Sequence, residues 1–215
     1  KYDAITLVDM AQTAGLVDLN VGLTTIDFAV FAGHKTLYGP TGISGFVMNP
    51  SVKFPAVIFG GTGYESANQD MPEDLPQKYE MGTLNISGIA GLNAALGWSA
   101  QVTIKAIREK EAENRKKLID LLSRYSYIKI IGDYDSCNYV GIVSCIIEGI
   151  SSDSAGPVFD RCGIAVRTGL QCAPLAHQFM GTFPAGTIRF SVNYFTTDKD
   201  FAELEEALDY IESEL

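Results

Sequence analysis

The chain has 215 residues, of which 47% are hydrophobic and 20% are charged, and its formal net charge is −10. This length and composition predict a globular protein with a sizeable core, organised as one large domain or two small ones. The negative charge argues against binding to nucleic acid or anionic membrane surfaces, and no apolar run is long enough to predict a membrane-spanning helix.

The N-terminal part reads as short strands separated by loops. Its first apolar run is continuous, which predicts a strand buried on both faces, and it ends at Asp9. The stretch from Pro50 to Pro76 has little apolar periodicity, and its Gly60-Gly-Thr-Gly63 segment fits an anion-binding nest and a flexible hinge equally well. The strands predicted here are Ala4–Val8, Phe28–Phe31 and Ile43–Met48.

The C-terminal part reads as α+β. A helical pattern runs from Ile86 to about Tyr125, first small and apolar and then amphipathic. The change of composition near Gln101 predicts a domain boundary, so residues 1–100 and 101–215 are expected to form separate domains. The later predicted elements are the strands Ile128–Ile131, Tyr139–Glu148, Ile164–Arg167 and Thr187–Asn193, and the helices Asp153–Cys162, capped by Ser151 or Ser152, and Thr197–Glu214.

The cysteines have no metal-binding spacing and suggest no disulfide framework. Cys145 lies in an apolar run and is expected in the core, whereas Cys137 and Cys162 receive no role. The N-terminal residues show no signal-peptide pattern, and we therefore expect a cytoplasmic protein with reduced thiols and no metal site.

Lys35 lies where the strand Phe28–Phe31 meets a glycine-rich turn. Burial of its ammonium group would be costly, so such a site favours the neutral amine, which can form a Schiff base. The surrounding glycines would let a bulky ligand approach the backbone. The simpler alternative is a lysine that extends from a strand end into solvent.

A second signal for a ligand site is the spacing of four polar residues, two of which lie well before this turn and two within it. Asp9-x-x-Gln12 followed by His34-Lys35 resembles the class V aminotransferase family, whose members depend on pyridoxal phosphate and share the PLP-dependent transferase fold. The resemblance implies that Asp9 faces the pyridinium nitrogen, Gln12 the phenolic oxygen and His34 the phosphate. It also implies that Lys35 carries the cofactor and moves a proton at the substrate Cα. Taken singly, Asp9 as a strand-end cap and His34 as a loop histidine remain the alternatives.

The C-terminal half resembles one branch of that family. Val166-Arg-Thr-Gly-Leu-Gln-Cys172-Ala-Pro-Leu-Ala-His177 and Gly186-Thr-Ile-Arg189-Phe-Ser191 are similar to the cysteine desulfurases and selenocysteine lyases. The resemblance implies that Cys172 accepts a persulfide and that Arg189 binds the substrate carboxylate through its planar fork. The alternatives are an inert loop thiol and a structural salt bridge. We also expect a mobile loop over about Thr168–Thr182.

The segment Tyr79-Glu-Met-Gly-Thr83-Leu-Asn85 resembles the family's Glu-x-Gly-Thr segment. In the family this threonine reaches the cofactor phosphate of the other subunit, so the resemblance implies a homodimer with Thr83 in the site. The alternative is an ordinary helix start capped by Ser87. The chain departs from the family at Ala32, where a serine is frequent, and at Leu170-Gln171, where a histidine often precedes the cysteine.

These observations predict an α/β chain made of the later half of a large PLP-binding domain, residues 1–100, and a small C-terminal α+β domain, residues 101–215. The predicted activity is a PLP-dependent cysteine desulfurase that converts L-cysteine to L-alanine, with a sulfur-acceptor protein as a further partner. Two alternatives remain: selenocysteine lyase or another β-elimination enzyme of class V, and a non-catalytic fragment that acts only as an assembly partner. Members of the family are longer, so we expect a missing N-terminal half to complete the sheet.

Overall fold

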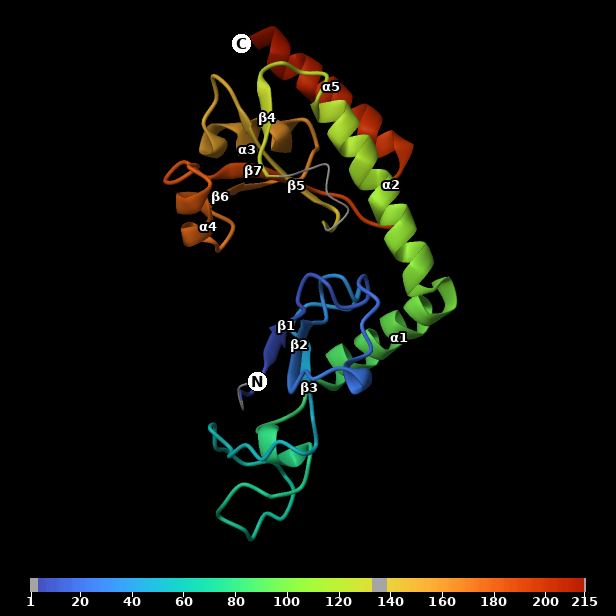
Figure 1. Ribbon diagram of the computed structural model, residues 1–215, viewed down its shortest axis with the longest axis vertical. Helices are drawn as coiled ribbons and strands as arrows, with labels where there is room; N and C mark the ends of the chain where they lie inside the picture. Colours follow the sequence, from blue (N-terminus) through green and yellow to red (C-terminus); the bar gives the residue numbers. More distant parts are fainter. Residues whose placement is uncertain (1–3, 133–138, 215) are drawn as a thin grey trace. The chain divides into compact units, whose positions relative to one another are not determined.

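The computed structural model describes residues 4–132 and 139–214, and the chain divides into two compact units, residues 1–104 and 105–215 (Figure 1). The helical stretch expected from Ile86 to Tyr125 is two helices, α1 (Ile86–Val102) and α2 (Ile104–Leu122). They are separated at Thr103, whose φ of 79° lies outside helical geometry. Within the described ranges, no helix is both long and apolar enough to cross a membrane.

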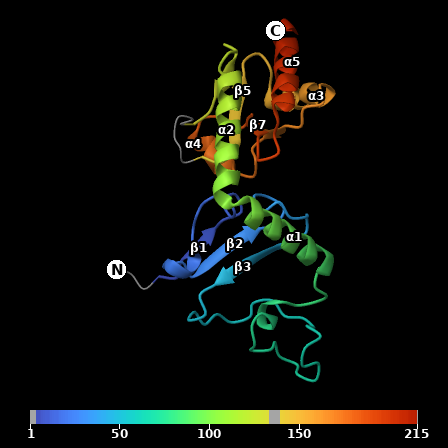
Figure 2. The same ribbon diagram turned by 90° about the vertical axis from the view of Figure 1, so that its right-hand side faces the viewer.

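The first unit is built on a mixed three-stranded sheet in the order β1-β2-β3 (Figure 2). β1 runs parallel to β2, with Asp9 opposite Val30, and β2 runs antiparallel to β3. A small core of Met10, Ala14, Ala29, Leu37 and Leu92 joins this sheet to α1. The strands and short helices of the unit are β1 (Leu7–Asp9), η1 (Val21–Leu23), β2 (Phe28–Ala32), β3 (Ser44–Met48) and η2 (Gln77–Tyr79).

Burial of the first strand on both faces is not what the structure shows. β1 begins at Leu7, later than expected, and Ile5 and Leu7 are 63% and 64% exposed. β1 is an edge strand, and α1 covers only the opposite face of the sheet, where Ala29 is buried. The uncovered face carries an apolar hollow of about 380 Å³, whose lining includes Leu7, Phe28, Val30, Phe46 and Ile58.

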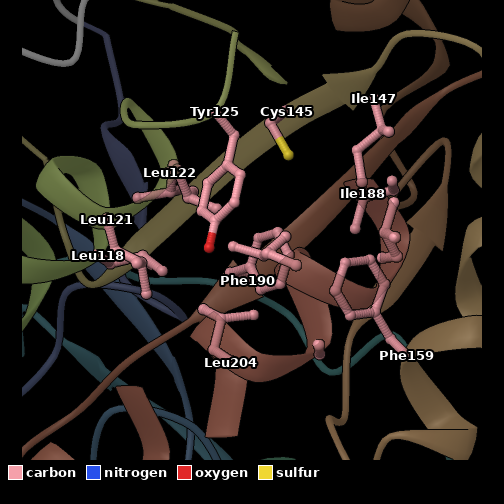
Figure 3. Packing of buried hydrophobic residues seen from close by; sticks show 14 of the residues in the cluster. Leu118, Leu121, Leu122, Tyr125, Cys145, Ile147, Phe159, Ile188, Phe190 and Leu204 are labelled. Atoms are coloured by element: carbon pink, nitrogen blue, oxygen red, sulfur yellow. The ribbon is translucent and has the colours of Figure 1, made fainter. Parts of the chain in front are cut away.

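The second unit contains a four-stranded antiparallel sheet in the order β4-β5-β7-β6. Alternate residues of β5, Val143, Cys145 and Ile147, are buried, and they share one core cluster with residues of α2, α3 and α5 (Figure 3). All three helices therefore pack on the same face of this sheet. The elements are β4 (Ile128–Ile130), β5 (Ile142–Ile147), α3 (Ser152–Arg161), β6 (Arg167–Gly169), α4 (Pro174–Phe179), β7 (Thr187–Ser191) and α5 (Asp198–Glu214).

Local sequence signals explain most of these boundaries. Ser151 caps α3 by accepting a hydrogen bond from Ser154 N at 3.2 Å, as the sequence predicted. The strand expected over Ile164–Arg167 instead begins at Arg167, because its ladder with β7 starts where Arg167 pairs with Arg189. Cys145 is fully buried, as expected, and burial raises the pKa of its thiol to about 12. Cys137 lies outside the described residues.

We predict that Leu122→Ala destabilises the second unit by about 2–5 kcal/mol, because it leaves a cavity where a fully buried side chain packs. Chemical denaturation of both variants by urea, followed by circular dichroism, measures this change. The matched control is Leu175→Ala, whose side chain is 77% exposed and whose removal is expected to change stability by less than about 0.5 kcal/mol. Equal effects of the two substitutions would contradict the assignment of the core.

Candidate functional site

Asp9 stands at the carboxyl end of β1, at the edge of the parallel pair. One of its oxygens, Oδ1, accepts a hydrogen bond from Ala11 N at 2.8 Å, so the carboxylate does cap the end of the strand. The other oxygen has no partner among the described residues, and the side chain is exposed. The cap therefore leaves half of the carboxylate available to a ligand. Gln12, in the turn that follows, is half-buried.

His34 and Lys35 lie in the turn that follows β2. Backbone hydrogen bonds from Lys35 N to Ala32 O (3.4 Å) and from Tyr38 N to Lys35 O (2.9 Å) shape this turn. Both side chains are exposed, so the described part of the chain does not bury the ammonium group of Lys35. The reason is that Leu37, and not Lys35, turns inward from this segment and packs in the core.

Gly33 fixes the point at which the chain leaves β2. It is buried, and Gly33 N donates to Ile43 O at 2.9 Å. A Cβ at this position would lie 2.8 Å from Ile43 Cγ2 and 2.9 Å from Ile43 O, closer than side chains pack. Glycine is thus the residue that lets β3 and the Lys35 turn approach each other.

Thr83 is exposed and lies just before α1. The helix is capped by Asn85 and not by Ser87, since Asn85 Oδ1 accepts from Gly88 N at 2.9 Å. Asn85 Nδ2 also donates to Gly42 O at 3.0 Å, which ties this segment to the glycine-rich turn between β2 and β3. The placement of Thr83 against a second subunit stays a prediction.

This set of side chains suits pyridoxal phosphate. An amine, an imidazole and a half-unpaired carboxylate lie in the segments that leave β1 and β2 at the same edge of the sheet, and all three are exposed. The ligand has an aldehyde for the amine of Lys35, a phosphate for His34 and a pyridinium nitrogen for Asp9. Among the described residues, Lys35 forms no ion pair that would occupy its amine.

The second unit brings two arginines together on the face of the sheet opposite its helices. Arg189 on β7 pairs directly with Arg167 on β6 and with Ser144 on β5, so the three side chains form one row. Arg189 is half-buried, and its Nε is buried without a hydrogen-bond partner in residues 4–132 and 139–214. Burial, and then the charge of Arg167, lower the pKa of Arg189, while Cys172 acts in the opposite direction.

This row has the character of an anion site. In the described part of the chain Arg189 makes no ion pair, so the alternative of a structural salt bridge finds no support there. Two neighbouring positive charges without a carboxylate partner favour an anionic ligand. Arg167 was not among the predicted site residues. Sequence reasoning could have included Arg167, because two strands expected in the same domain each carry an arginine.

Cys172 lies in the turn between β6 and α4, and its side chain is exposed. The mobile loop expected over Thr168–Thr182 has more structure than predicted, because residues 174–179 form α4. His177 on that helix is buried, and its Nδ1 lies 2.6 Å from Thr182 Oγ1, so it serves the fold of this segment. The predicted site residues thus fall into one set in each unit: Asp9, Gln12, His34, Lys35 and Thr83 in the first, and Cys172 and Arg189 in the second.

Comparison with known proteins identifies a matching family and several proteins similar in sequence to this chain. The family model described as aminotransferase class-V matches residues 1–204. A probable cysteine desulfurase of Methanothermobacter thermautotrophicus is 32% identical over 214 residues, which are 97% of this chain and 53% of the relative. Probable cysteine desulfurase 2 of Mycobacterium leprae is 31% identical over 98% of this chain and 51% of its own length.

Solved structures show the same fold. The cysteine desulfurase CsdA from Escherichia coli, in an S-sulfonic acid form, superposes with a TM-score of 0.85 at 27% identity, over 98% of this chain and 52% of that one. The apo cysteine desulfurase of Thermococcus onnurineus NA1 gives a TM-score of 0.83 at 24% identity, over 99% and 53%. The fold predicted from the sequence, that of PLP-dependent transferases, is therefore confirmed. The chain spans about half the length of the relatives that it matches.

We predict that Gly33→Ala costs about 1–3 kcal/mol of stability and weakens cofactor binding, because the added methyl group displaces the Lys35 turn from β3. Thermal unfolding and titration with pyridoxal phosphate measure the two effects. Gly97→Ala is the matched control, because a Cβ at Gly97 meets nothing within 4 Å. Alanine in place of this helical glycine is expected to raise the stability of the protein by about 0.5–1 kcal/mol. A Gly33→Ala protein that binds the cofactor like the unaltered protein would refute this account of the turn.

Proposed function

Because the chain belongs to the aminotransferase class-V family, we propose that it carries the lysine and the cysteine of a cysteine desulfurase. Members of this family are pyridoxal phosphate enzymes. The reaction converts L-cysteine to L-alanine and leaves the sulfur as a persulfide on Cys172. The observation that carries the proposal is an exposed thiol in the unit that pairs Arg167 with Arg189, neither of which forms an ion pair within the described ranges. The same chain presents Asp9 and Lys35 at one edge of a sheet.

The first unit would hold the cofactor. Asp9 would receive the pyridinium nitrogen on its free oxygen, Gln12 the phenolic oxygen and His34 the phosphate. When bound, pyridoxal phosphate supplies an electron sink for negative charge at the substrate Cα. Ala32 provides no hydroxyl for the phosphate, and the loss of one neutral contact costs about 1 kcal/mol.

Lys35 would act twice in this site. Its amine binds the cofactor, and once the substrate has taken that place the free amine can remove a proton from the substrate Cα or return one. The exposed position of Lys35, outside the packed core, supports this role, because the side chain can move between the two tasks without repacking its neighbours.

Arg189 would bind the carboxylate of L-cysteine. A planar guanidinium donates two parallel hydrogen bonds to a carboxylate, and the Nε of Arg189 is a buried donor that still lacks an acceptor. Arg167 adds a second positive charge in the same row. A bound carboxylate would offset the repulsion between the two arginines.

Cys172 would take the sulfur. Its thiolate attacks the substrate sulfur, an S–S bond forms, and the bond between that sulfur and the substrate carbon breaks. The electron pair of the broken bond stays with the carbon, which gains a proton to become alanine. Exposure of Cys172 in a surface turn supports the next step, in which a thiol acceptor removes the persulfide sulfur.

We further propose that the complete enzyme is a homodimer in which Thr83 reaches the cofactor phosphate of the second subunit. The anchored position of the Thr83 segment beside the turn at Gly42 supports this.

The names of the relatives favour desulfuration over selenocysteine lysis.

We predict that L-cysteine leaves a persulfide on Cys172 of the cofactor-loaded protein, detected by alkylation without reductant and peptide mass spectrometry. Cys172→Ser should lower alanine formation at least about a hundredfold, because no other thiol takes its place. Cys162→Ser is the control and should keep full activity, since Cys162 packs against the core cluster of its unit. A persulfide on Cys137, Cys145 or Cys162, and never on Cys172, would reject the mechanism. A Cys172→Ser protein that still cleaves selenocysteine would favour the lyase.

A further inference from the structure

Cys172 occupies a strained backbone turn. Ala173 N donates to Leu170 O at 2.8 Å, so residues 170–173 form a hydrogen-bonded β-turn. The two central residues, Gln171 and Cys172, have φ values of 53° and 63°. Positive φ at both centres is typical of the I′ class of turns, which favours asparagine and glycine and disfavours side chains such as these. Something other than local preference therefore holds this turn in place.

The side chain of Gln171 supplies that hold. Its Nε2 lies 2.9 Å from Arg167 O, 3.3 Å from Gly169 O and 3.4 Å from Thr187 O. These carbonyls belong to β6 and β7, so one side-chain amide links the turn to the ends of both strands. All three neighbours accept hydrogen bonds only, which leaves the –NH₂ group as the end that faces them.

The arrangement buries one polar atom of the Gln171 amide at an energetic cost. This cost indicates that the surrounding residues hold the amide in place. Gln171 Oε1 is buried and has no hydrogen-bond partner among the residues that the structure describes. The backbone beside it is also closely packed, because a Cβ on Gly186 would lie 2.3 Å from the carbonyl carbon of Gly169. A glutamine has two amide protons for these carbonyls and the length to reach them, whereas a neutral histidine ring has a single N–H.

We propose that Gln171 is a positioning residue, which fixes the Cys172 thiol for sulfur transfer by clamping the strained turn to β6 and β7. The inference rests on the proposed function in one respect, namely that Cys172 accepts sulfur. Gln171 touches no reacting atom and acts through the backbone.

The test compares Gln171→Ala and Gln171→Asn with the unaltered, cofactor-loaded protein. Asparagine keeps an amide and tolerates positive φ, but it is one methylene shorter and cannot reach Arg167 O. Gln178→Ala is the matched control, because Gln178 is exposed on the neighbouring α4. One readout is hydrogen–deuterium exchange of the peptide that contains Ala173. The other is the separation of kcat from KM for L-cysteine.

Both Gln171 variants should exchange the Ala173 amide about tenfold faster, as expected when such hydrogen bonds are lost. Their kcat should fall about tenfold while KM changes less than about twofold, because the arginines that bind the substrate remain. Gln178→Ala should match the unaltered protein in both readouts. Unchanged exchange in the Gln171 variants would overturn the proposal, and so would faster exchange with an unchanged kcat.

The exchange measurement needs neither L-cysteine nor turnover, so it separates this inference from the proposed function. If the unaltered protein forms no persulfide, the proposed function fails and the catalytic part of the positioning role fails with it. Exchange still decides whether Gln171 holds the turn. A Gln171→Asn protein with normal exchange and normal kcat would show that turn preference alone places Cys172.

Discussion

The parallel pairing of β1 with β2 is the constraint on which the first site depends. The register sets Asp9 opposite Val30, and β2 runs on to Ala32 before the chain turns at Gly33. A carboxylate and an amine from distant parts of the sequence thereby reach the same edge of one sheet. The carboxyl ends of parallel strands are where α/β proteins commonly bind ligands. Close packing of Gly33 against Ile43 keeps the turn against β3, so the position of Lys35 follows from backbone geometry.

The second unit uses a sheet with two different faces. α2, α3 and α5 cover one face, and the main core cluster of the unit lies between these helices and the sheet. The opposite face carries Arg167 and the half-buried Arg189, a like-charged pair that would cost stability in a core. Its position also explains the lowered pKa of Arg189, which is partly buried next to a positive neighbour. One face of the sheet thus carries the core that stabilises the unit, and the opposite face carries the arginines proposed to bind a ligand.

The sequence predicted correctly those features that depend on interactions between residues close together in the chain. The strand at Phe28, the cap at Ser151 and the buried thiol of Cys145 follow from apolar runs and capping chemistry. The sequence left open whether Lys35 is buried, because a strand-end pattern does not show which residue of the next turn points inward. The exposure of Leu7 was missed because β1 lies at an edge, and a single sequence does not reveal its neighbours.

The candidate site was partly accessible to sequence reasoning. Motif resemblance named Lys35, Asp9, Cys172 and Arg189, and their roles remain predictions. The pairing of Arg167 with Arg189 depends on strand register, which the sequence pattern left open. The link from Gln171 to three carbonyls depends on a turn with positive φ at two residues that rarely adopt it. Propensity would have excluded this turn.

The most direct measurement is the site of cofactor attachment in the loaded protein. Reduction with borohydride followed by peptide mass spectrometry locates the lysine that carries pyridoxal phosphate. Lys35 lies in the turn that leaves β2 at the edge of the sheet that carries Asp9, whereas Lys78 forms an ion pair with Glu73 at 2.5 Å, which raises the pKa of Lys78. We expect the label on Lys35. A label on Lys53 or Lys78, with Lys35 unmodified, would contradict the account.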